Sequence, residues 1–117
     1  MTYDRTNVFA KILRGEIPCA KLYEDDYAIA FADIAPSAPA HVLVIPKGEF
    51  ISFDHFVRTA SADMLQHFFA AVQKVAQQCC GPDYRVITNN GEAAGQSVHH
   101  FHVHLLSGKP LGPLLAE

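Results

Sequence analysis

The chain lacks several features that mark specialised classes of protein. No apolar stretch approaches the roughly 20 residues needed to cross a membrane, and no signal-peptide pattern stands at its start. The nine Lys and Arg residues form no cluster and the net charge is −3, which argues against a nucleic-acid partner. We therefore expect a cytoplasmic protein that binds neither membranes nor nucleic acids.

Cysteine is scarce and tryptophan is absent. The three cysteines, Cys19, Cys79 and Cys80, are odd in number and two are adjacent, so they do not form a disulfide framework. They fit a reducing compartment, as small apolar side chains that are more often buried than reactive. Half of the 117 residues are apolar, which predicts one folded domain, residues 1–117, with its own core.

Histidine, in contrast, is concentrated in one short run. Four of the seven histidines fall between positions 99 and 104. From position 100 onward, imidazole and apolar side chains alternate, which predicts a strand with the imidazoles on one face. Imidazole can serve as a base or nucleophile near pH 7. The alternating residues are His100, Phe101, His102, Val103, His104 and Leu105. A metal site and a solvated polar face are the alternative explanations for this pattern.

A loop of small residues, 91–97, leads directly into the histidine run. Glycines let backbone N–H groups converge on an anion without a Cβ in the way, and the hydroxyl of Ser97 adds a donor. We therefore expect the N–H groups from Gly95 through Gln96 to Ser97 to hold a phosphate beside the imidazoles.

The remaining patterns predict an α+β domain with an antiparallel meander sheet. Asn7 and Ser61 are expected to cap a short and a long helix, and a connecting loop with a short turn near Phe53 precedes the long one. The first residues, 1–6, are polar and expected to be loose, and 107–117 an extended tail. The predicted strands are 21–24, 27–33, 41–46, 84–89 and the histidine run, with the long helix ending at Gly81-Pro82.

The run GQSVHHFHVHLL, residues 95–106, resembles the signature of the histidine triad (HIT) superfamily. The Gln-Ser pair within it resembles the Hint branch, the nucleoside phosphoramidate hydrolases, and the resemblance extends over nearly the whole chain. It implies a HIT-like sheet continued across a homodimer. It also implies hydrolysis of a purine nucleoside phosphoramidate to a nucleoside monophosphate and an amine, with no metal and no cofactor.

The resemblance also implies a role for individual residues. His102 would attack the phosphorus, and His100 and His41 would orient it and help move its proton. His104 and the 95–97 loop would stabilise the phosphoryl oxygens, and Ser97 would hydrogen-bond the departing nitrogen. Asp33, which by residue type alone also suits a turn, would accept both ribose hydroxyls. The remaining substrate contacts would be a phosphate- or leaving-group-side donor, Asn89, and the base pocket of Phe9, Ile12, Phe31, Ile34 and Leu43.

The chain departs from its relatives at a few positions. Asn7 and Ala10 stand where some bacterial relatives carry a zinc-binding Cys-x-x-Cys pair, so we expect no such zinc. Ala32 replaces a frequent histidine, and the tryptophan that ends many eukaryotic relatives is missing. Three other functions stay open from the residues: a dinucleoside polyphosphate hydrolase, a non-catalytic nucleotide-binding protein, and a metalloprotein using His41 with two strand histidines.

Overall fold

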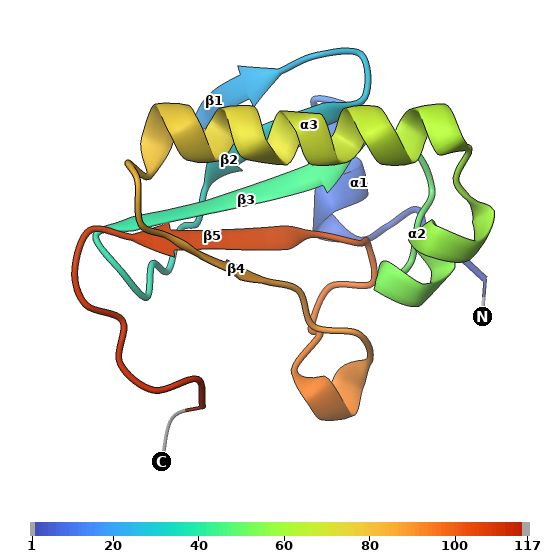
Figure 1. The fold of residues 1–117 in the computed structure, drawn as a ribbon. Coiled ribbons are helices and arrows are strands. Elements are labelled where there is room, and N and C mark those ends of the chain that lie inside the picture. Colours follow the sequence, from blue (N-terminus) through green and yellow to red (C-terminus); the bar gives the residue numbers. More distant parts are fainter. Residues whose placement is uncertain (1, 116–117) are drawn as a thin grey trace.

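A five-stranded antiparallel sheet forms the centre of the computed structural model, which describes residues 2–115 (Figure 1). The strands lie in the order β1-β2-β3-β5-β4, so the last strand of the chain inserts between two earlier ones. This α+β arrangement is the predicted one. The elements are α1 (Val8–Leu13), β1 (Lys21–Glu24), β2 (Ala28–Ala32), β3 (Ala40–Pro46), α2 (Phe53–Thr59), α3 (Ala62–Cys79), β4 (Arg85–Ile87), the 3-10 turn η1 (Glu92–Ala94) and β5 (Val103–Ser107).

The helices begin at polar caps. The side chain of Asn7 accepts a hydrogen bond from the Ala10 amide, and Ser61 accepts one from Met64, as the sequence predicts. The segment expected to be a loop around Phe53 is instead the two-turn helix α2. We overlooked its cap, Ser52, whose hydroxyl accepts from the amide of His55.

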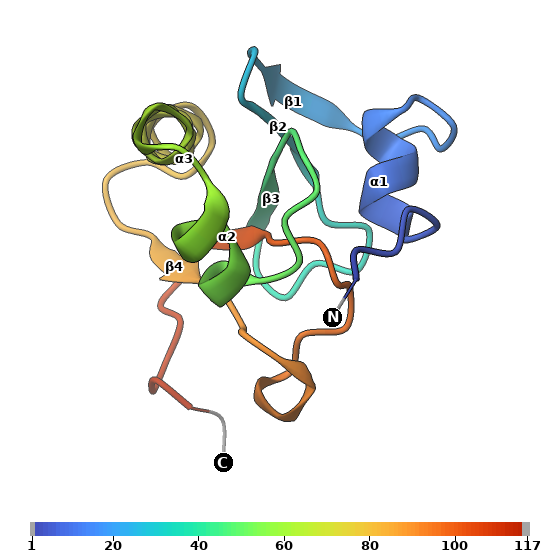
Figure 2. The ribbon, with the colours of Figure 1, turned by 90° about the vertical axis from the view of Figure 1, so that its right-hand side faces the viewer.

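Two helices cover opposite faces of the sheet. Figure 2 shows α3 end-on at one side of β2 and β3, with α1 at the other. Because neighbouring side chains of a strand point to opposite faces, β3 serves two cores at once. Val42 and Val44 join the core under α3, while Leu43 and Ile45 join the core under α1. The prediction that this strand is buried on both faces is confirmed.

The histidine strand is shorter than predicted. Regular pairing of β5 begins only at Val103, so His100 and His102 lie in the irregular segment before it. Tertiary contacts replace ladder bonds there, since the amide of Phe101 donates to the carbonyl of Phe50 and the Thr88 hydroxyl donates to that of His102. The alternation itself survives, because Phe101, like Val103 and Leu105, packs into the core under α3.

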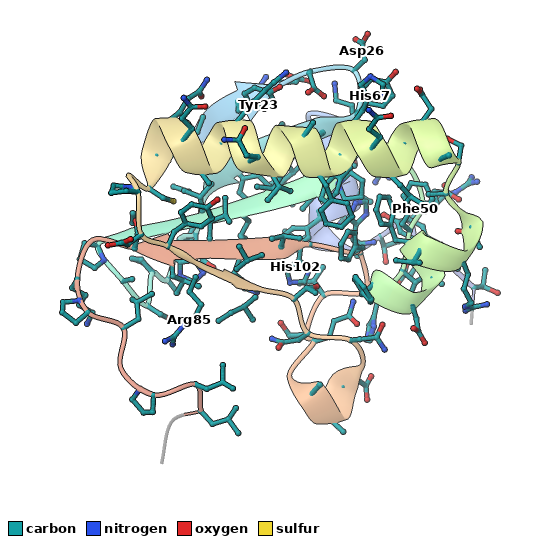
Figure 3. The ribbon with its side chains drawn as sticks, in the orientation of Figure 1. Tyr23, Asp26, Phe50, His67, Arg85 and His102 are labelled. Carbon is teal, nitrogen blue, oxygen red and sulfur yellow. The ribbon has the colours of Figure 1, made fainter. Side chains whose placement is uncertain are left out.

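One edge of the sheet is the short strand β4, which covers only part of the predicted 84–89. Arg85 reaches from this strand toward the C-terminal segment (Figure 3), where it donates to the carbonyls of Gly112 and Pro113. Residues 108–115 contain no helix or strand, and the last two residues of the predicted tail lie outside the described part. Among the described residues, no helix is long and apolar enough to cross a membrane.

The N-terminal segment is held in place, contrary to expectation. The hydroxyl of Tyr3 lies 2.5 Å from His100 Nδ1, and the Asp4 carboxylate accepts bonds from both the amide and the hydroxyl of Thr6. The first residue of the segment predicted to be loose, Met1, lies outside the described residues. A short polar stretch offers no periodic pattern from which these contacts could have been predicted.

Candidate active site

A cavity of about 320 Å³ opens on the α1 side of the sheet. Nine residues selected from the sequence lie on its wall: Phe9, Ile12, Phe31, Asp33, Ile34, Leu43, Ser97, His102 and His104. Apolar side chains and imidazoles share this wall, the composition expected of a pocket for a flat base joined to a polar group. Sequence reasoning missed Val8, Ile17, Pro18, Cys19, Ala32 and Val98, which also line it.

One ring nitrogen of His102 is hydrogen-bonded within the protein, and the side chain lines the cavity. Its Nδ1 lies 2.7 Å from the backbone carbonyl of His100. A carbonyl only accepts, so the proton sits on Nδ1 and the Nε2 lone pair is left without a partner among residues 2–115. The ring of Phe9 packs edge-on against the imidazole, with centroids 4.9 Å apart. His102 is thereby oriented as a nucleophile or base.

His104 is oriented by a chain of two hydrogen bonds. The amide of Ser37 donates to His41 Nδ1 at 3.0 Å, so a neutral His41 carries its proton on Nε2. That Nε2 lies 2.9 Å from His104 Nδ1, to which it donates. His104 therefore carries its own proton on Nε2 and lines the cavity as a hydrogen-bond donor. The expectation that His41 orients His102 is corrected, because its partner is His104.

Asp33 serves two purposes in the same region. One carboxylate oxygen accepts a 2.8 Å hydrogen bond from the amide of Ala35, which is the turn-forming role its residue type suggests. The other oxygen lies 3.4 Å from His41 Nε2, and the side chain lines the cavity. Each carboxylate oxygen can accept more than one hydrogen bond, so Asp33 can bind a ligand hydroxyl while it keeps the turn.

Asp33, His41 and His104 place one potential metal ligand each within 4.8 Å of one another. A metal there would need the lone pair of His41 Nε2. The Ser37 amide already uses the lone pair on Nδ1, so the proton of neutral His41 sits on Nε2. The cluster is therefore arranged for hydrogen bonding, and a metal could enter only with loss of the bond from Ser37.

His100 does not share the cavity with the other two histidines. Its side chain is fully buried, with Nδ1 against Tyr3 and Nε2 2.9 Å from the carbonyl of Pro46. The prediction of three imidazoles in one open row is therefore wrong for this member. The strand is irregular at this point, and both ring nitrogens find partners in the interior. His100 reaches the site through its carbonyl, which holds His102.

The predicted phosphate cradle is only partly present. Gly91 and Gly95, with φ of 91° and 102°, allow the turn η1, but this turn consumes two of the three amides expected to hold an anion. The amide of Gly95 donates to Glu92, and that of Gln96 donates to Gly91. The Gln96 side chain is buried and bonded to the backbone of Gly91, Ile51 and Val98. Ser97 is exposed and borders the cavity, which leaves its hydroxyl as the loop's side-chain donor there.

Two other residues predicted to contact the substrate lie at the edge of the cavity or outside it. Ile34 borders the cavity but is fully exposed, so half of the expected base sandwich is open to solvent. Asn89 is not on the cavity wall, and its side chain lies beside Gly95. Asn7 and Ala10 stand at the positions of the zinc-binding Cys-x-x-Cys pair of some relatives. Here Asn7 caps α1 and Ala10 is buried.

Burial keeps the three triad imidazoles neutral at pH 7. It lowers the pKa of His100 to about 4, slightly offset by the bond to Pro46. It also lowers the pKa of His104 to about 4, helped by the neighbouring rings of His102 and His41. The pKa of His102 is lowered by burial too, while the bond to the His100 carbonyl and the charge of Asp33 oppose this. The free site thus offers a lone pair and a neutral N–H donor, not an imidazolium.

This geometry agrees with comparisons to known proteins. The HIT domain family pattern matches residues 14–111. An uncharacterized HIT-like protein of 13.2 kDa from Azospirillum brasilense is 48% identical over 118 residues, covering 99% of this chain and 97% of its own. The purine nucleoside phosphoramidase of Escherichia coli K12 is 41% identical over 112 residues, covering 94% and 93% respectively.

Solved structures show the same architecture. A histidine triad protein from Clostridium difficile superimposes with a TM-score of 0.84 at 37% identity, covering 97% of this chain and all of that one. A HIT family hydrolase from Clostridium thermocellum gives a TM-score of 0.84 at 42% identity, covering 97% and 99%. The alternating histidines, the sheet order and these matches agree, and the chain belongs to the HIT family.

Proposed function

We propose that the protein is a purine nucleoside phosphoramidate hydrolase that passes through a nucleotidyl-histidine on His102. The observation that carries the proposal is the tautomer of His102, whose Nδ1 proton is held by the His100 carbonyl so that the Nε2 lone pair is available. The similarity to the phosphoramidase from Escherichia coli supports the choice of bond. The mixed apolar and polar lining of the cavity supports a nucleotide-like substrate.

In the first step, Nε2 of His102 attacks the α-phosphorus and the phosphorus–nitrogen bond breaks. The departing nitrogen takes up a proton from solvent water and leaves as the amine, hydrogen-bonded by Ser97. The His102 ring then carries a positive charge, which the His100 carbonyl stabilises through the bond to Nδ1–H. The Nε2–H of His104, held by His41, donates to a phosphoryl oxygen.

In the second step, water attacks the same phosphorus and gives up a proton to solvent, while His102 leaves with its electron pair. A nucleoside monophosphate is released and the original tautomer returns. The charged phosphoryl-imidazole is a good leaving group, which is why splitting the reaction in two lowers the barrier. The scheme uses no metal or cofactor, because the Nε2–H of His104 and the hydroxyl of Ser97 supply the hydrogen bonds that it needs.

We assign binding of the nucleoside to the apolar residues of the cavity wall. Phe9 and Phe31 lie edge-to-face with centroids 5.6 Å apart, and Leu43 completes an apolar slot for the base. The carboxylate of Asp33 accepts hydrogen bonds from the ribose hydroxyls. We propose homodimer formation through β4, the sheet edge where Val86 is 54% exposed, which light scattering can test.

Trapping the intermediate tests the reaction class. The reaction with adenosine 5′-phosphoramidate is quenched rapidly, without acid, during turnover. Mass spectrometry should then show protein heavier by one nucleotidyl group, with the adduct mapped to residue 102. Parallel assays with diadenosine polyphosphates measure the competing activity. Preferential turnover of the polyphosphate, or an adduct on another residue, would refute the proposal. Nucleotide binding with no turnover of either would favour a binding protein.

A further inference from the structure

The N-terminal segment closes over the buried member of the histidine triad. The Tyr3 hydroxyl lies 2.5 Å from His100 Nδ1, and the two rings meet edge-on with centroids 5.6 Å apart. Tyr3 is itself half-buried, and its partner is separated from it by 97 positions in the chain. None of the chemistry proposed for the cavity uses this contact.

The direction of the Tyr3 bond follows from the other side of the His100 ring. The carbonyl of Pro46 can only accept, so His100 Nε2 carries the proton and Nδ1 presents a lone pair. The phenol must therefore be the donor. Burial raises the pKa of Tyr3 and lowers the pKa of His100 to about 4, so at pH 7 the phenol keeps its proton and the imidazole stays neutral.

The ring of His100 is thus held at both nitrogens, by groups that lie 97 and 54 positions before it in the chain. Its own backbone carbonyl is the acceptor that keeps the proton of His102 on Nδ1. Without the phenol, His100 Nδ1 would be a buried acceptor with no partner among the described residues. Phe9 packs edge-on against this ring at 6.4 Å between centroids, so relief requires rotation of the ring or entry of water.

We propose that Tyr3 is a positioning residue for the reaction. By donating to His100 Nδ1 it holds the His100 backbone in the place where its carbonyl orients the Nε2 lone pair of His102. Its kinetic consequence rests on the function proposed above, but its structural consequence does not. Tyr3 touches neither the cavity wall nor any reacting atom, so its removal should change the rate of the chemical step and leave substrate binding intact.

The test compares Tyr3→Phe with Tyr84→Phe, which removes a phenol from an exposed side chain that does not line the cavity. In Tyr3→Phe the ¹⁵N resonance of His100 Nδ1 should move. The Nδ1 proton of His102 should exchange with water about tenfold faster, because its acceptor is less well held. The kcat on adenosine 5′-phosphoramidate should fall about tenfold with KM within about twofold of wild type. Tyr84→Phe should change none of these values.

Unchanged imidazole resonances and exchange of His102 in folded Tyr3→Phe would overturn the proposal, whatever the kinetics. If wild-type protein hydrolyses no phosphoramidate, the proposed function fails, and the imidazole signals still decide the role of Tyr3. Should Tyr3→Phe not fold, wild-type protein decides: coupling across the hydrogen bond between the Tyr3 hydroxyl proton and His100 Nδ1 supports the proposal. A freely exchanging hydroxyl without that coupling overturns it.

Discussion

The two faces of the sheet are built from neighbouring residues of the same strands, yet they have different tasks. Under α3, Phe56, Phe68 and Phe101 pack into one aromatic core in which Phe56 and Phe101 stack at 4.7 Å. Under α1, which is six residues long against eighteen for α3, the apolar cluster is smaller and a cavity opens beside it. A short helix that leaves one end of its sheet face uncovered therefore creates the room for a ligand.

The segment from residue 101 to 105 connects the two faces. Phe101, Val103 and Leu105 anchor it in the closed core, while His102 and His104 face the cavity. The packing of one set thus positions the other, in the way a rigid scaffold preorganises reactive groups. Substitutions on opposite faces should consequently separate folding from chemistry.

The largest expected effect is on the open face. His102→Ala should lower kcat at least about 10³-fold, because both proposed steps require its lone pair. Thermal unfolding and affinity for AMP should change little. His67→Ala, at an exposed histidine stacked on Tyr27, is the matched control and should keep full activity. Near-complete activity in His102→Ala would remove the basis of the mechanism.

Paired phenylalanine substitutions sharpen the comparison. Phe68→Ala, in the closed core, should lower the free energy of unfolding by about 3–5 kcal/mol through the cavity it leaves. Phe9→Ala, on the cavity wall, should cost less stability but raise KM about tenfold through lost contact with the base. Urea unfolding and steady-state kinetics measure both quantities. Equal stability losses with no KM change for Phe9 would show that the two faces do not differ as described.

The smallest expected effect is on stability at acid pH. The pKa values of His100 and His104 are about 4 in the folded protein, below the ordinary 6.5, so between these values the unfolded chain binds more protons. These two histidines should therefore lower the free energy of unfolding as pH falls from 6.5 to 4, and contribute no further change below pH 4. His100→Gln should remove the His100 share of this slope and leave the share of His104, whereas His67→Gln should retain the whole slope. An undiminished slope in His100→Gln would assign the effect to other groups.

Much of the fold could be predicted from local patterns. The caps Asn7 and Ser61, the doubly buried strand β3 and the long helix follow from side-chain chemistry and periodicity over a few neighbours. The helix α2 was missed because its seven residues carry too short a periodic pattern. The glycine loop was misjudged because composition indicates that a turn can form, but does not show which amides the turn will use.

The sequence by itself determined which residues alternate between the two faces of β5, because that period is a property of the extended backbone. The resemblance to the HIT superfamily located nine residues of the cavity wall, four of them apolar residues on α1, β2 and β3. Only the tertiary structure decided the protonation of His100 and His104. The partners that set it lie 54 positions away for His100 and Pro46, 63 for His104 and His41, and 97 for His100 and Tyr3. A ring's tautomer depends on whether its neighbour in space donates or accepts, and folding alone chooses that neighbour.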